Sequence, residues 1–507
     1  MAHVLALRAT PWFDHLVVDP EYYDAWAQRI AAGDWMGDRT FYMDPFYPYV
    51  LGALYAIVGR DLLVVRLVQV ALSAIACVLV ARLGRRVGGP AVGLLAAVGF
   101  ALYEPEIFYV AEIDKTCLSV LLAAATLVLA LGRSDRARFG AGVALGLAAL
   151  TRANLLVMAP LGVVALLIYG ARRHAALFAA GVALALAPVV WRNHHVSGEW
   201  VLTTAQAGQN FYTGNNPTNP WGAYGALPFV RGNPHFEETD FRAAGESRAG
   251  HALAPGEVSR FWFAEGFRHM REHPAFAARA MLRKLVLFWN DFEISDNQDQ
   301  YLLERESWVL RLPLLGFGWL AALAVLGAIA AFRTHGSVRL LVAVVGVYCV
   351  SVVAFFIFSR YRIQVVPALL PLAALGATTL LAGVRAGRWA NVARGAGVVA
   401  CVALFSFHSF DVFARDNEYA TEMRLRHLGE MYLIAGQPER AIAAYQEAIA
   451  RCPLHCRGAL EALTEAYLAT GRRADAEAYL RRFTREHPEH PDGARHLARV
   501  QESAPGG

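Results

Sequence analysis

The residues of this sequence best suited to chemistry are carboxylates placed before and between its apolar runs. Asp19 stands immediately before Pro20, which favours the first turn of a helix. The apolar residues that follow at helical spacing are Tyr23, Ala27 and Ile30. This pattern predicts a short amphipathic helix on a membrane surface, with a carboxylate at its N-terminal edge. Such a carboxylate can act as a general base or can simply cap the helix, and both interpretations are open for Asp19.

A second acidic segment lies in a turn between two apolar runs. It contains Glu104, Glu106, Glu112, Asp114 and Lys115. Charged side chains at the end of a membrane-crossing helix are unfavourable unless they line a water-filled cavity or pair with one another. The same residues can also lie at the wet interface with no further role, so two interpretations of Asp114 and Lys115 stay open.

Arginines at the ends of other apolar runs, on the side of the membrane that carries the acidic segments, are candidates for binding an anion. Ser359-Arg-Tyr-Arg362 lies between two apolar runs and places Arg360 and Arg362 where arginine is otherwise scarce. Arg152 lies at another helix end on that side. Because guanidinium groups match phosphate oxygens, we expect an anionic lipid headgroup or a phosphate at this cluster.

The composition is that of a membrane protein. Of 507 residues, 56% are hydrophobic and 18% charged, and the mean hydropathy is +0.35. These values exclude a soluble domain and predict an all-α, polytopic membrane protein. The net charge of +5 is modest and gives no indication of nucleic-acid binding. Arginine greatly outnumbers lysine, which occurs only at positions 115 and 284. This excess of arginine indicates a GC-rich bacterial genome.

Ten apolar runs are predicted as spans, and several of them, notably 139–151, are short for a full crossing. They cover about 61–83, 88–103, 108–132, 139–151, 154–170, 175–191, 308–331, 340–358, 363–385 and 392–410. Arginines collect in alternate short loops, at 82–86, 133–138, 172–173, 333–339 and 385–394. These loops are therefore predicted to be cytoplasmic. The loops 9–60 and 192–307 and everything after about residue 411 are then extracytoplasmic, in a bacterial inner membrane.

Ten spans put both ends of the chain outside the cytoplasm. A chain that begins outside without a preceding span is difficult to insert, so we expect an upstream first helix to be missing, with residues 3–9 as its tail. Pro45 and Pro48 are expected to bend the first loop into an interfacial hairpin. An amphipathic helix is predicted at 275–289 in the long loop.

Other sites are disfavoured by the sequence. His194 and His195 are adjacent, so they cannot both face one metal ion from a helix or a strand. No Gly-rich phosphate loop, C-x2-C zinc pair or serine elbow occurs, which argues against soluble nucleotide chemistry.

The C-terminal part contains an internal repeat with a spacing of 35 residues. Leu428, Gly429, Tyr432, Gly436, Ala441, Tyr445, Ala448 and Pro453 correspond to Leu463, Thr464, Tyr467, Gly471, Ala476, Leu480, Phe483 and Pro488. This is the tetratricopeptide pattern. It predicts a domain at 418–502, with repeats at about 422–455 and 457–490 and a trailing helix, that binds a protein partner. Cys452 and Cys456 at the corner can form a disulfide or stay unpaired.

Short motifs in the first 411 residues occur in the order and on the side found in a known family. They are Asp19, Tyr23 and Ala27; Pro45, Tyr47 and Pro48; Asp114; and Arg360 with Tyr361. By these motifs residues 1–411 resemble the GT-C membrane glycosyltransferases, specifically the dolichyl-phosphate-mannose protein mannosyltransferase and aminoarabinose transferase group (glycosyltransferase family 39). Two departures are the missing first helix and Asp44, where the family usually has a proline or a neighbouring polar residue.

The resemblance implies transfer of one hexosyl or pentosyl unit from a polyprenyl-phosphate donor to an acceptor hydroxyl group, with inversion. It assigns Asp19 as the base and Asp114 as the second catalytic carboxylate. The candidates for holding the donor phosphate are Lys115, Arg152, Arg360 and Arg362. The other substrate-binding candidates are Tyr23, Glu112 and Tyr361. A divalent cation held by Glu112 and Asp114 is an open alternative, and no metal ligand set is assigned.

Three other functions are consistent with parts of the sequence. An oligosaccharide ligase or polymerase of the O-antigen type would depend on His194 or His251 in the large loop and not on Asp19. A transporter would need charges at mid-membrane, and few occur inside the apolar runs. A scaffold would use the repeats alone and leave the acidic turns unexplained. The sugar and the acceptor, whether protein, lipid or glycan, are not determined by the sequence.

Overall fold

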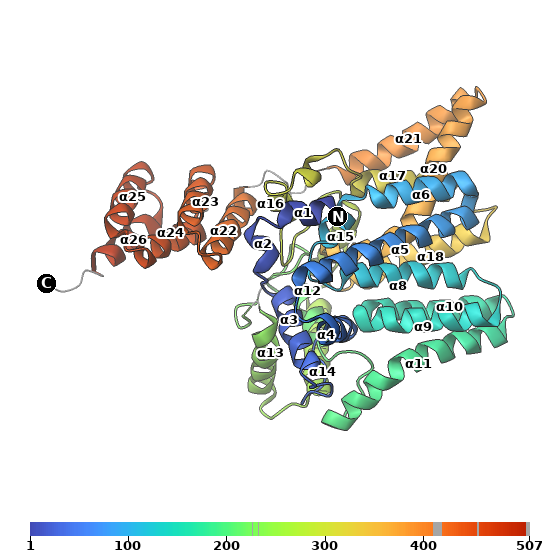
Figure 1. Cartoon of the computed structure of the whole chain (residues 1–507), viewed down its shortest axis with the longest axis horizontal. Coiled ribbons are helices and arrows are strands. Elements are labelled where there is room, and N and C mark those ends of the chain that lie inside the picture. Colours follow the sequence, from blue (N-terminus) through green and yellow to red (C-terminus); the bar gives the residue numbers. More distant parts are fainter. Residues whose placement is uncertain (226, 232, 409–417, 454–455, 503–507) are drawn as a thin grey trace. The chain divides into compact units, whose positions relative to one another are not determined.

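The computed structural model of the chain describes residues 1–507 except 226, 232, 409–417, 454–455 and 503–507 (Figure 1). The described residues form α-helices and short 3-10 helices, with two isolated β-bridges and no named strand among them. The chain divides into two compact units. The membrane unit contains Met1 and residues 17–298 and 312–408, and the C-terminal unit contains residues 2–16, 299–311 and 409–507.

Each of the ten apolar runs contains a helix of the membrane unit. These helices are α5 (Leu62–Gly88), α6 (Pro90–Ala101), α8 (Thr116–Ala130), α9 (Asp135–Thr151), α10 (Met158–Ile168), α11 (Arg172–Ser197), α17 (Phe317–Ala331), α18 (Gly336–Val353), α20 (Val366–Arg385) and α21 (Trp389–Ser406). Within the described residues, five helical stretches are long and apolar enough to cross a membrane: α5, α11, α18, Ser359–Arg385 and α21. The all-α membrane fold is thus confirmed.

Two predicted spans begin later than expected. The run 108–132 is divided, because the short helix α7 (Glu104–Tyr109) ends before a turn that contains Asp114, and α8 starts only at Thr116. The run 308–331 opens with a 3-10 helix at Trp308–Arg311, and α17 starts after it at Phe317. In both cases polar residues or a proline at the head of the run interrupt the helix.

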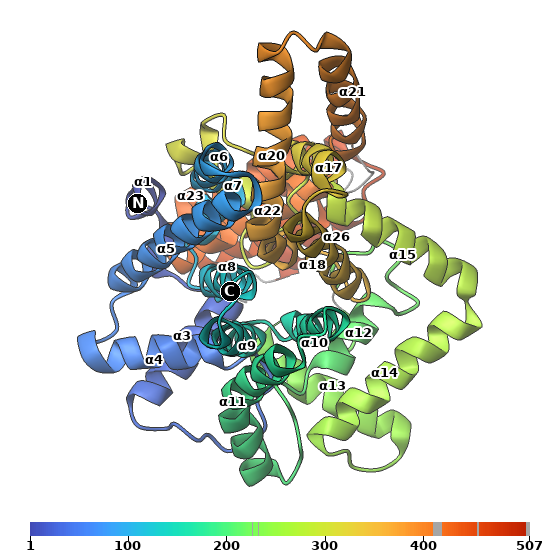
Figure 2. The ribbon, with the colours of Figure 1, turned by 90° about the vertical axis from the view of Figure 1, so that its right-hand side faces the viewer.

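Glycines permit the closest contacts between the membrane helices. A Cβ atom added at Gly142 on α9 would lie 2.0 Å from the carbonyl oxygen of Phe178 on α11. One added at Gly327 on α17 would lie 1.9 Å from the carbonyl oxygen of Leu372 on α20. Close backbone approach at small residues is a main source of helix association in membranes. Figure 2 shows α8, α9 and α10 end-on and beside one another.

The two ends of the helix bundle differ in character. The arginine-bearing connections α5–α6, α8–α9 and α20–α21 lie at its right-hand end in Figure 1. Towards the other end lie the helices of the polar segments, α3 (Asp19–Ala31), α12 (Ala207–Gly214) and α13 (Pro234–Ala249). This separation agrees with the alternation of the arginine-rich loops, and the assignment of the arginine-rich end to the cytoplasm stays a prediction.

The first loop contains a second helix in place of the predicted proline bend. Helix α4 (Phe46–Val58) begins directly after Pro45 and has Pro48 in its first turn, where no intrahelical N–H bond is lost. Helices α3 and α4 pack closely, since a Cβ atom added at Gly52 would lie 2.7 Å from Ile30. In the long loop, α14 (Pro255–Glu272) is followed by α15 (Pro274–Trp289), which confirms the helix predicted at 275–289.

The C-terminal unit has paired helices in the predicted repeat regions. They are α22 (Glu418–Ile434) with α23 (Pro438–Arg451), and α24 (Arg457–Ala469) with α25 (Arg473–Glu486), followed by α26 (Pro491–Glu502). Their identity as tetratricopeptide repeats stays a prediction, and part of the corner between them, at 454–455, lies outside the described residues. No disulfide joins Cys452 to Cys456 in the structure.

The C-terminal unit also includes two segments that the predicted boundary at residue 411 assigns to the membrane domain. The short helices α1 (Ala2–Leu7) and α2 (Pro11–Asp14) belong to it, as does α16 (Gln300–Leu303). His3 Nδ1 lies 2.8 Å from the hydroxyl of Ser307. Arg424 Nε donates to Asp299 at 2.9 Å and joins the second segment to α22. In addition, α1 packs against the 3-10 helix Trp308–Arg311, and α2 and α16 pack against α22, so these segments belong with the C-terminal helices.

Candidate active site

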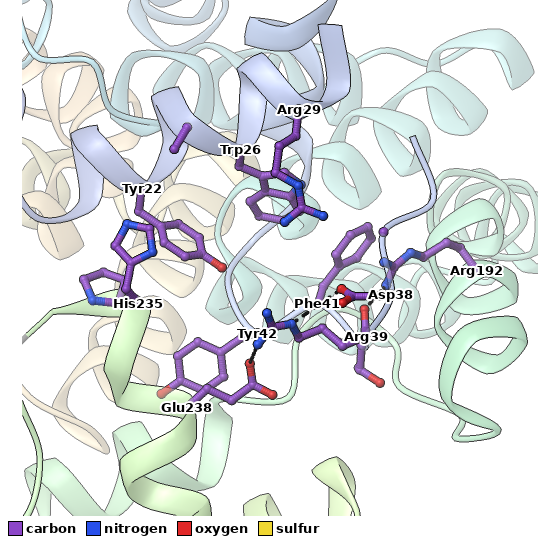
Figure 3. A pocket seen from close by; sticks show the side chains of 14 residues that line it. Tyr22, Trp26, Arg29, Asp38, Arg39, Phe41, Tyr42, Arg192, His235 and Glu238 are labelled. Carbon is purple, nitrogen blue, oxygen red and sulfur yellow. Dashed lines mark hydrogen bonds and ion pairs between the residues drawn. The ribbon is translucent and has the colours of Figure 1, made fainter. Parts of the chain in front are cut away.

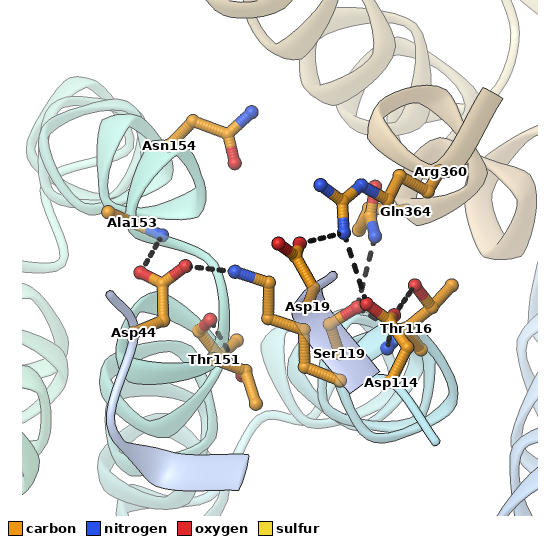
Figure 4. A network of polar contacts seen from close by, with 12 residues as sticks. Asp19, Asp44, Asp114, Thr116, Ser119, Thr151, Ala153, Asn154, Arg360 and Gln364 are labelled. Atoms are coloured by element: carbon orange, nitrogen blue, oxygen red, sulfur yellow. Dashed lines mark hydrogen bonds and ion pairs between the residues drawn. The ribbon is translucent and has the colours of Figure 1, made fainter. Parts of the chain in front are cut away.

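Asp19 is not used as a helix cap. It is the first residue of α3, and no side-chain capping bond is made at that terminus. The residue before it, Val18, has φ of 56°, a strained conformation for a β-branched residue. The Asp19 carboxylate is buried and accepts a hydrogen bond of 2.6 Å from Nη1 of Arg360 (Figure 4). Its position at the start of α3 therefore directs it into a polar cluster, and the simple capping interpretation does not apply.

Arg360 is the centre of this cluster. It lies on the short helix α19 (Ser359–Arg362) and its side chain is buried. Its Nη1 lies 2.6 Å from Asp19 Oδ2 and 3.2 Å from Asp114 Oδ2, and its Nη2 forms an ion pair with Asp296. One guanidinium thus joins three carboxylates that are far apart in the sequence. The three carboxylates and Arg360 are called the Arg360 cluster below.

Asp114 is held rigidly in the turn before α8. Its Oδ1 accepts a bond of 2.7 Å from the backbone N–H of Thr116 and one from the Thr116 hydroxyl. Burial opposes ionisation of Asp114, but Arg360 and Arg152 outweigh burial and hold its pKa below the usual value. The carboxylate therefore stays charged at neutral pH, and its position is set by α8.

A second ion pair lies beside the cluster. Lys115, the residue after Asp114, donates to Asp44 Oδ2, and both side chains are buried. Asp44 Oδ1 accepts a bond of 3.1 Å from the backbone N–H of Ala153, at the start of the 3-10 helix Ala153–Val157. The ammonium group of Lys115 also lies 5.7 Å from the centre of the Tyr23 ring. Asp44 thereby brings Lys115 next to the segment that carries Arg152.

Arg152 has unused hydrogen-bonding capacity. The residue is buried, and its guanidinium carbon lies 4.8 Å from the centre of the Tyr361 ring. Its Nε and Nη2 are buried and have no acceptor among the described residues. A buried donor without an acceptor is unfavourable by roughly 1–3 kcal/mol, and by more when it is charged. Arg152 is therefore the member of this site most suited to bind an anion.

Three acidic side chains line a small cavity at the cluster. The lining residues are Phe108, Tyr109, Glu112, Asp114, Asp296, Asn297, Gln298 and Arg360. Burial raises the pKa of Glu112 to about 8, against the attraction of Arg66. Burial also raises the pKa of Asp296 from 3.8 to about 7, because the attraction of Arg360 is offset by repulsion from Asp19 and Asp114. The cavity thus combines a charged Asp114 with carboxyl groups that readily hold a proton.

The raised pKa of Asp296 gives the stability of the protein a pH dependence of known sign. Between pH 4 and pH 7 the folded Asp296 binds a proton that the unfolded chain has lost, so stability falls as the pH rises through this window. The variant Asp296→Asn lacks this contribution. Its melting temperature is expected to rise relative to the wild type from pH 4 to pH 7, whereas the exposed control Asp61→Asn keeps a constant offset. If the melting temperatures of Asp296→Asn and of the wild type change in parallel from pH 4 to pH 7, the prediction is contradicted.

Of the nine sequence-predicted site residues, only Asp19, Asp114 and Arg360 belong to the Arg360 cluster, and Arg362 and Tyr23 are among the six outside it. Arg362 is buried and its Nη2 pairs with Glu293 at 2.7 Å, while Nη1 and Nη2 also donate to backbone carbonyl groups between residues 287 and 292. Arg362 therefore fixes the end of α15 and does not point to Asp19. Tyr23 is fully buried, and its hydroxyl has no hydrogen-bond partner among the described residues.

Asp296 and Asp44 were not predicted as site residues. Asp296 lies in the polar stretch 293–299 that follows α15, where several acidic and amide residues occur together. Asp44 stands out only as an acidic residue directly before Pro45. A cluster of acids in an otherwise apolar chain is the signal that points to both, but their partners are decided by the fold.

The histidines of the long loop are not arranged as metal ligands. His194 stacks on Trp200 with ring centres 4.0 Å apart, and His195 stacks on Trp191 at 5.3 Å. His251 is exposed. No group of three potential metal-binding side chains occurs in the part of the chain that the structure describes. The carboxylates Asp19, Asp114 and Asp296, which would be the natural oxygen ligands, are bound to Arg360 instead.

Comparisons with known proteins agree with the resemblance predicted from the motifs. Residues 42–191 match the family described as dolichyl-phosphate-mannose-protein mannosyltransferase. This segment includes Asp44, Asp114, Lys115 and Arg152. No curated protein matches the chain with significance.

The fold was also compared with solved structures. The apo structure of ArnT from Cupriavidus metallidurans is 15% identical, with 74% of this chain and 77% of that chain covered and a TM-score of 0.33. The structure of the same protein bound to undecaprenyl phosphate is 17% identical, with 75% of this chain and 78% of that chain covered and a TM-score of 0.33. The apo oligosaccharyltransferase of Archaeoglobus fulgidus is 13% identical, with 84% of this chain and 57% of that chain covered and a TM-score of 0.44.

Proposed function

We propose that this chain, a polytopic membrane protein similar to the GT-C glycosyltransferases, transfers a sugar from a polyprenyl-phosphate-linked donor to an acceptor hydroxyl group. The observation that carries the proposal is the buried guanidinium of Arg152, whose Nε and Nη2 have no acceptor among the described residues, beside a cluster of buried carboxylates. A phosphate group supplies the acceptors that these donors lack. The family match at residues 42–191 supports the same reaction class.

The donor phosphate binds at the positive side of the site. Arg152 and Lys115 both adjoin Asp44, which contacts Lys115 Nζ and the N–H of Ala153. When the phosphate binds between them, Lys115 exchanges part of its contact with Asp44 for a phosphate oxygen. Fixed positive charge then stabilises the polyprenyl phosphate as it leaves the anomeric carbon.

The acceptor is activated by Asp19. Its carboxylate takes the proton as the acceptor oxygen attacks the anomeric carbon, a new C–O bond forms, and the bond to the phosphate oxygen breaks with its electron pair going to the phosphate. Arg360 holds Asp19 in one orientation until the acceptor is present. Attack from the face opposite the phosphate gives inversion at the anomeric carbon.

The site faces the extracytoplasmic side of a bacterial cytoplasmic membrane in this proposal. The support is that the polar helices lie towards the end of the bundle opposite the arginine-rich connections (Figure 1). The transferred unit is a hexosyl or pentosyl group. Residues 418–502 are proposed to bind a protein partner through their paired helices.

Turnover of the donor tests the proposal. The chain is reconstituted in nanodiscs with radiolabelled polyprenyl-phosphate hexoses and pentoses together with membrane extract as acceptor. We expect transfer from at least one donor, and kcat/KM lower by about 10²-fold in Arg152→Gln, the loss expected for one charge-assisted contact to the leaving group. The matched control Arg136→Gln, at the other end of the bundle, keeps wild-type activity. Absence of transfer from every donor would reject the proposal, and equal activity of Arg152→Gln would reject the role of Arg152.

A further inference from the structure

A second pocket lies on another face of α3. Its volume is about 160 Å³, and it is lined by Tyr22, Ala25, Trp26, Arg29, Gly37, Asp38, Arg39, Thr40, Phe41, Tyr42, Arg192, Pro234, His235 and Glu238 (Figure 3). Asp19 and Tyr23 are among the buried residues of α3, and neither lines this pocket. The pocket is smaller than the roughly 300–1,000 Å³ typical of drug-sized ligands, and it suits a single ring.

Aromatic side chains form the floor and wall of this pocket. Trp26 contacts Tyr22 with ring centres 6.0 Å apart and Phe41 at 5.3 Å, and His235 contacts Tyr22 at 5.0 Å. The rings are inclined to one another by 49–72°, so they are not stacked face to face and several ring faces border the cavity. Tyr22 and Trp26 are half-buried. Such faces accept the apolar C–H face of a ring while tolerating water at its edge.

Charged groups of both signs form the rim. Arg39 lies 3.6 Å from Asp38 and 3.5 Å from Glu238, at the long limit of a hydrogen bond, and most of its side chain is exposed. Arg192 instead donates to the backbone carbonyl groups of Met36 and Arg39 and packs on the Phe41 ring at 3.8 Å. Arg192 therefore holds the loop in place. Glu238 Oε1 accepts a bond of 2.9 Å from Arg242, so the weakly held groups at the rim are Arg39, Asp38 and Glu238 Oε2.

This combination fits a neutral polyhydroxyl ring. A hydroxyl group both donates and accepts, so neighbouring hydroxyls can bind a carboxylate and a guanidinium at once. An extended peptide would need a row of backbone partners or a long groove, which a pocket of about 160 Å³ does not offer. The observations thus favour a sugar over a polypeptide segment.

The pocket is close to the proposed base. Tyr22 follows Asp19 by three residues on α3, which is about 4.5 Å along the helix axis and an adjacent face. On α13, Glu238 lines the pocket, and its neighbour Glu237 accepts a bond of 3.2 Å from Tyr224 and is within the field of Asp19 and Asp296. A ligand ring in the pocket can therefore be linked to a second ring at Asp19.

We infer that this pocket binds one sugar unit of a glycan acceptor and so selects a saccharide as the acceptor class. This inference rests on the proposed function. The sugar in the pocket stacks on Trp26 and Tyr22, and its hydroxyls bind Arg39 and Glu238. The unit beyond it presents its hydroxyl group to Asp19.

Direct binding of simple glycosides tests the pocket. The protein is placed in phospholipid nanodiscs, free of sugar-headed detergent, and saturation-transfer NMR is recorded with methyl glycosides of mannose, glucose, galactose, glucosamine and N-acetylglucosamine. We expect transfer to the ring protons of at least one glycoside. The dissociation constant is expected to rise at least tenfold in Trp26→Ala and severalfold in Glu238→Gln, which keeps the size of the side chain. Trp221→Ala, outside the pocket, is the matched control and keeps wild-type binding.

Binding and turnover separate this inference from the proposed function. Glycoside binding that depends on Trp26, without donor turnover, would leave the sugar pocket standing and reject the transferase. Donor turnover with no glycoside binding, or with binding unchanged in both Trp26→Ala and Glu238→Gln, would overturn the pocket. Competition by peptides in place of glycosides would overturn it in favour of a polypeptide acceptor.

Discussion

Asp19→Asn is expected to lower kcat for sugar transfer by about 10²–10⁴-fold, the range attributed to a positioned general base. Asparagine has nearly the same shape and can still accept a hydrogen bond from Arg360, so the fold should be retained. It cannot take the proton of the attacking hydroxyl group. The measurement is single-turnover transfer from the radiolabelled donor, with the melting temperature recorded in parallel.

The matched control for this substitution is Asp61→Asn. Asp61 caps α5 by accepting from the N–H groups of Leu63 and Val64, and asparagine caps a helix equally well. The control should therefore keep both activity and stability. If Asp19→Asn is folded and transfers sugar at the wild-type rate, Asp19 has no catalytic role, and Asp114 would be the next carboxylate to test.

Arg360→Ala is expected to have the largest effect on stability, because it leaves three buried carboxylates without their common cation. Removing one partner of a buried ion pair lowers stability by about 3–5 kcal/mol. The measurement is the melting temperature in nanodiscs. Sugar transfer should also be lost, since Asp19 would no longer be held in its position beside Asp114.

Two variants separate this effect from a general loss of packing. Arg231→Ala removes an exposed arginine that pairs with Asp240, and it should leave the melting temperature nearly unchanged. Adding Asp114→Asn to Arg360→Ala removes the carboxylate that Arg152, Lys115 and Thr116 also favour in its charged form, and it should recover part of the lost stability. If the double variant is no more stable than Arg360→Ala, the unpaired carboxylate charges are not the cause of the stability lost in Arg360→Ala.

The sequence by itself determined the membrane helices and most candidate residues. A long apolar run forms a helix wherever it lies, because the backbone satisfies its own hydrogen bonds within the segment. The start of α3 at Asp19-Pro20 and of α15 at Pro274 is likewise local, since proline favours the first turn. The start of α4 was not predicted from the sequence. Pro48 lies in the first turn of α4, where proline is also favoured, although a bend was predicted there.

The tertiary structure decided which charges meet. Arg360 and Arg362 have the same side chain two residues apart, but positions two apart on a helix point in nearly opposite directions. One therefore joins Asp19, Asp114 and Asp296, and the other binds Glu293 and backbone carbonyls. Partners hundreds of residues apart leave no local spacing to read, and for this reason Asp296 and Asp44 were found only when the helices were packed together.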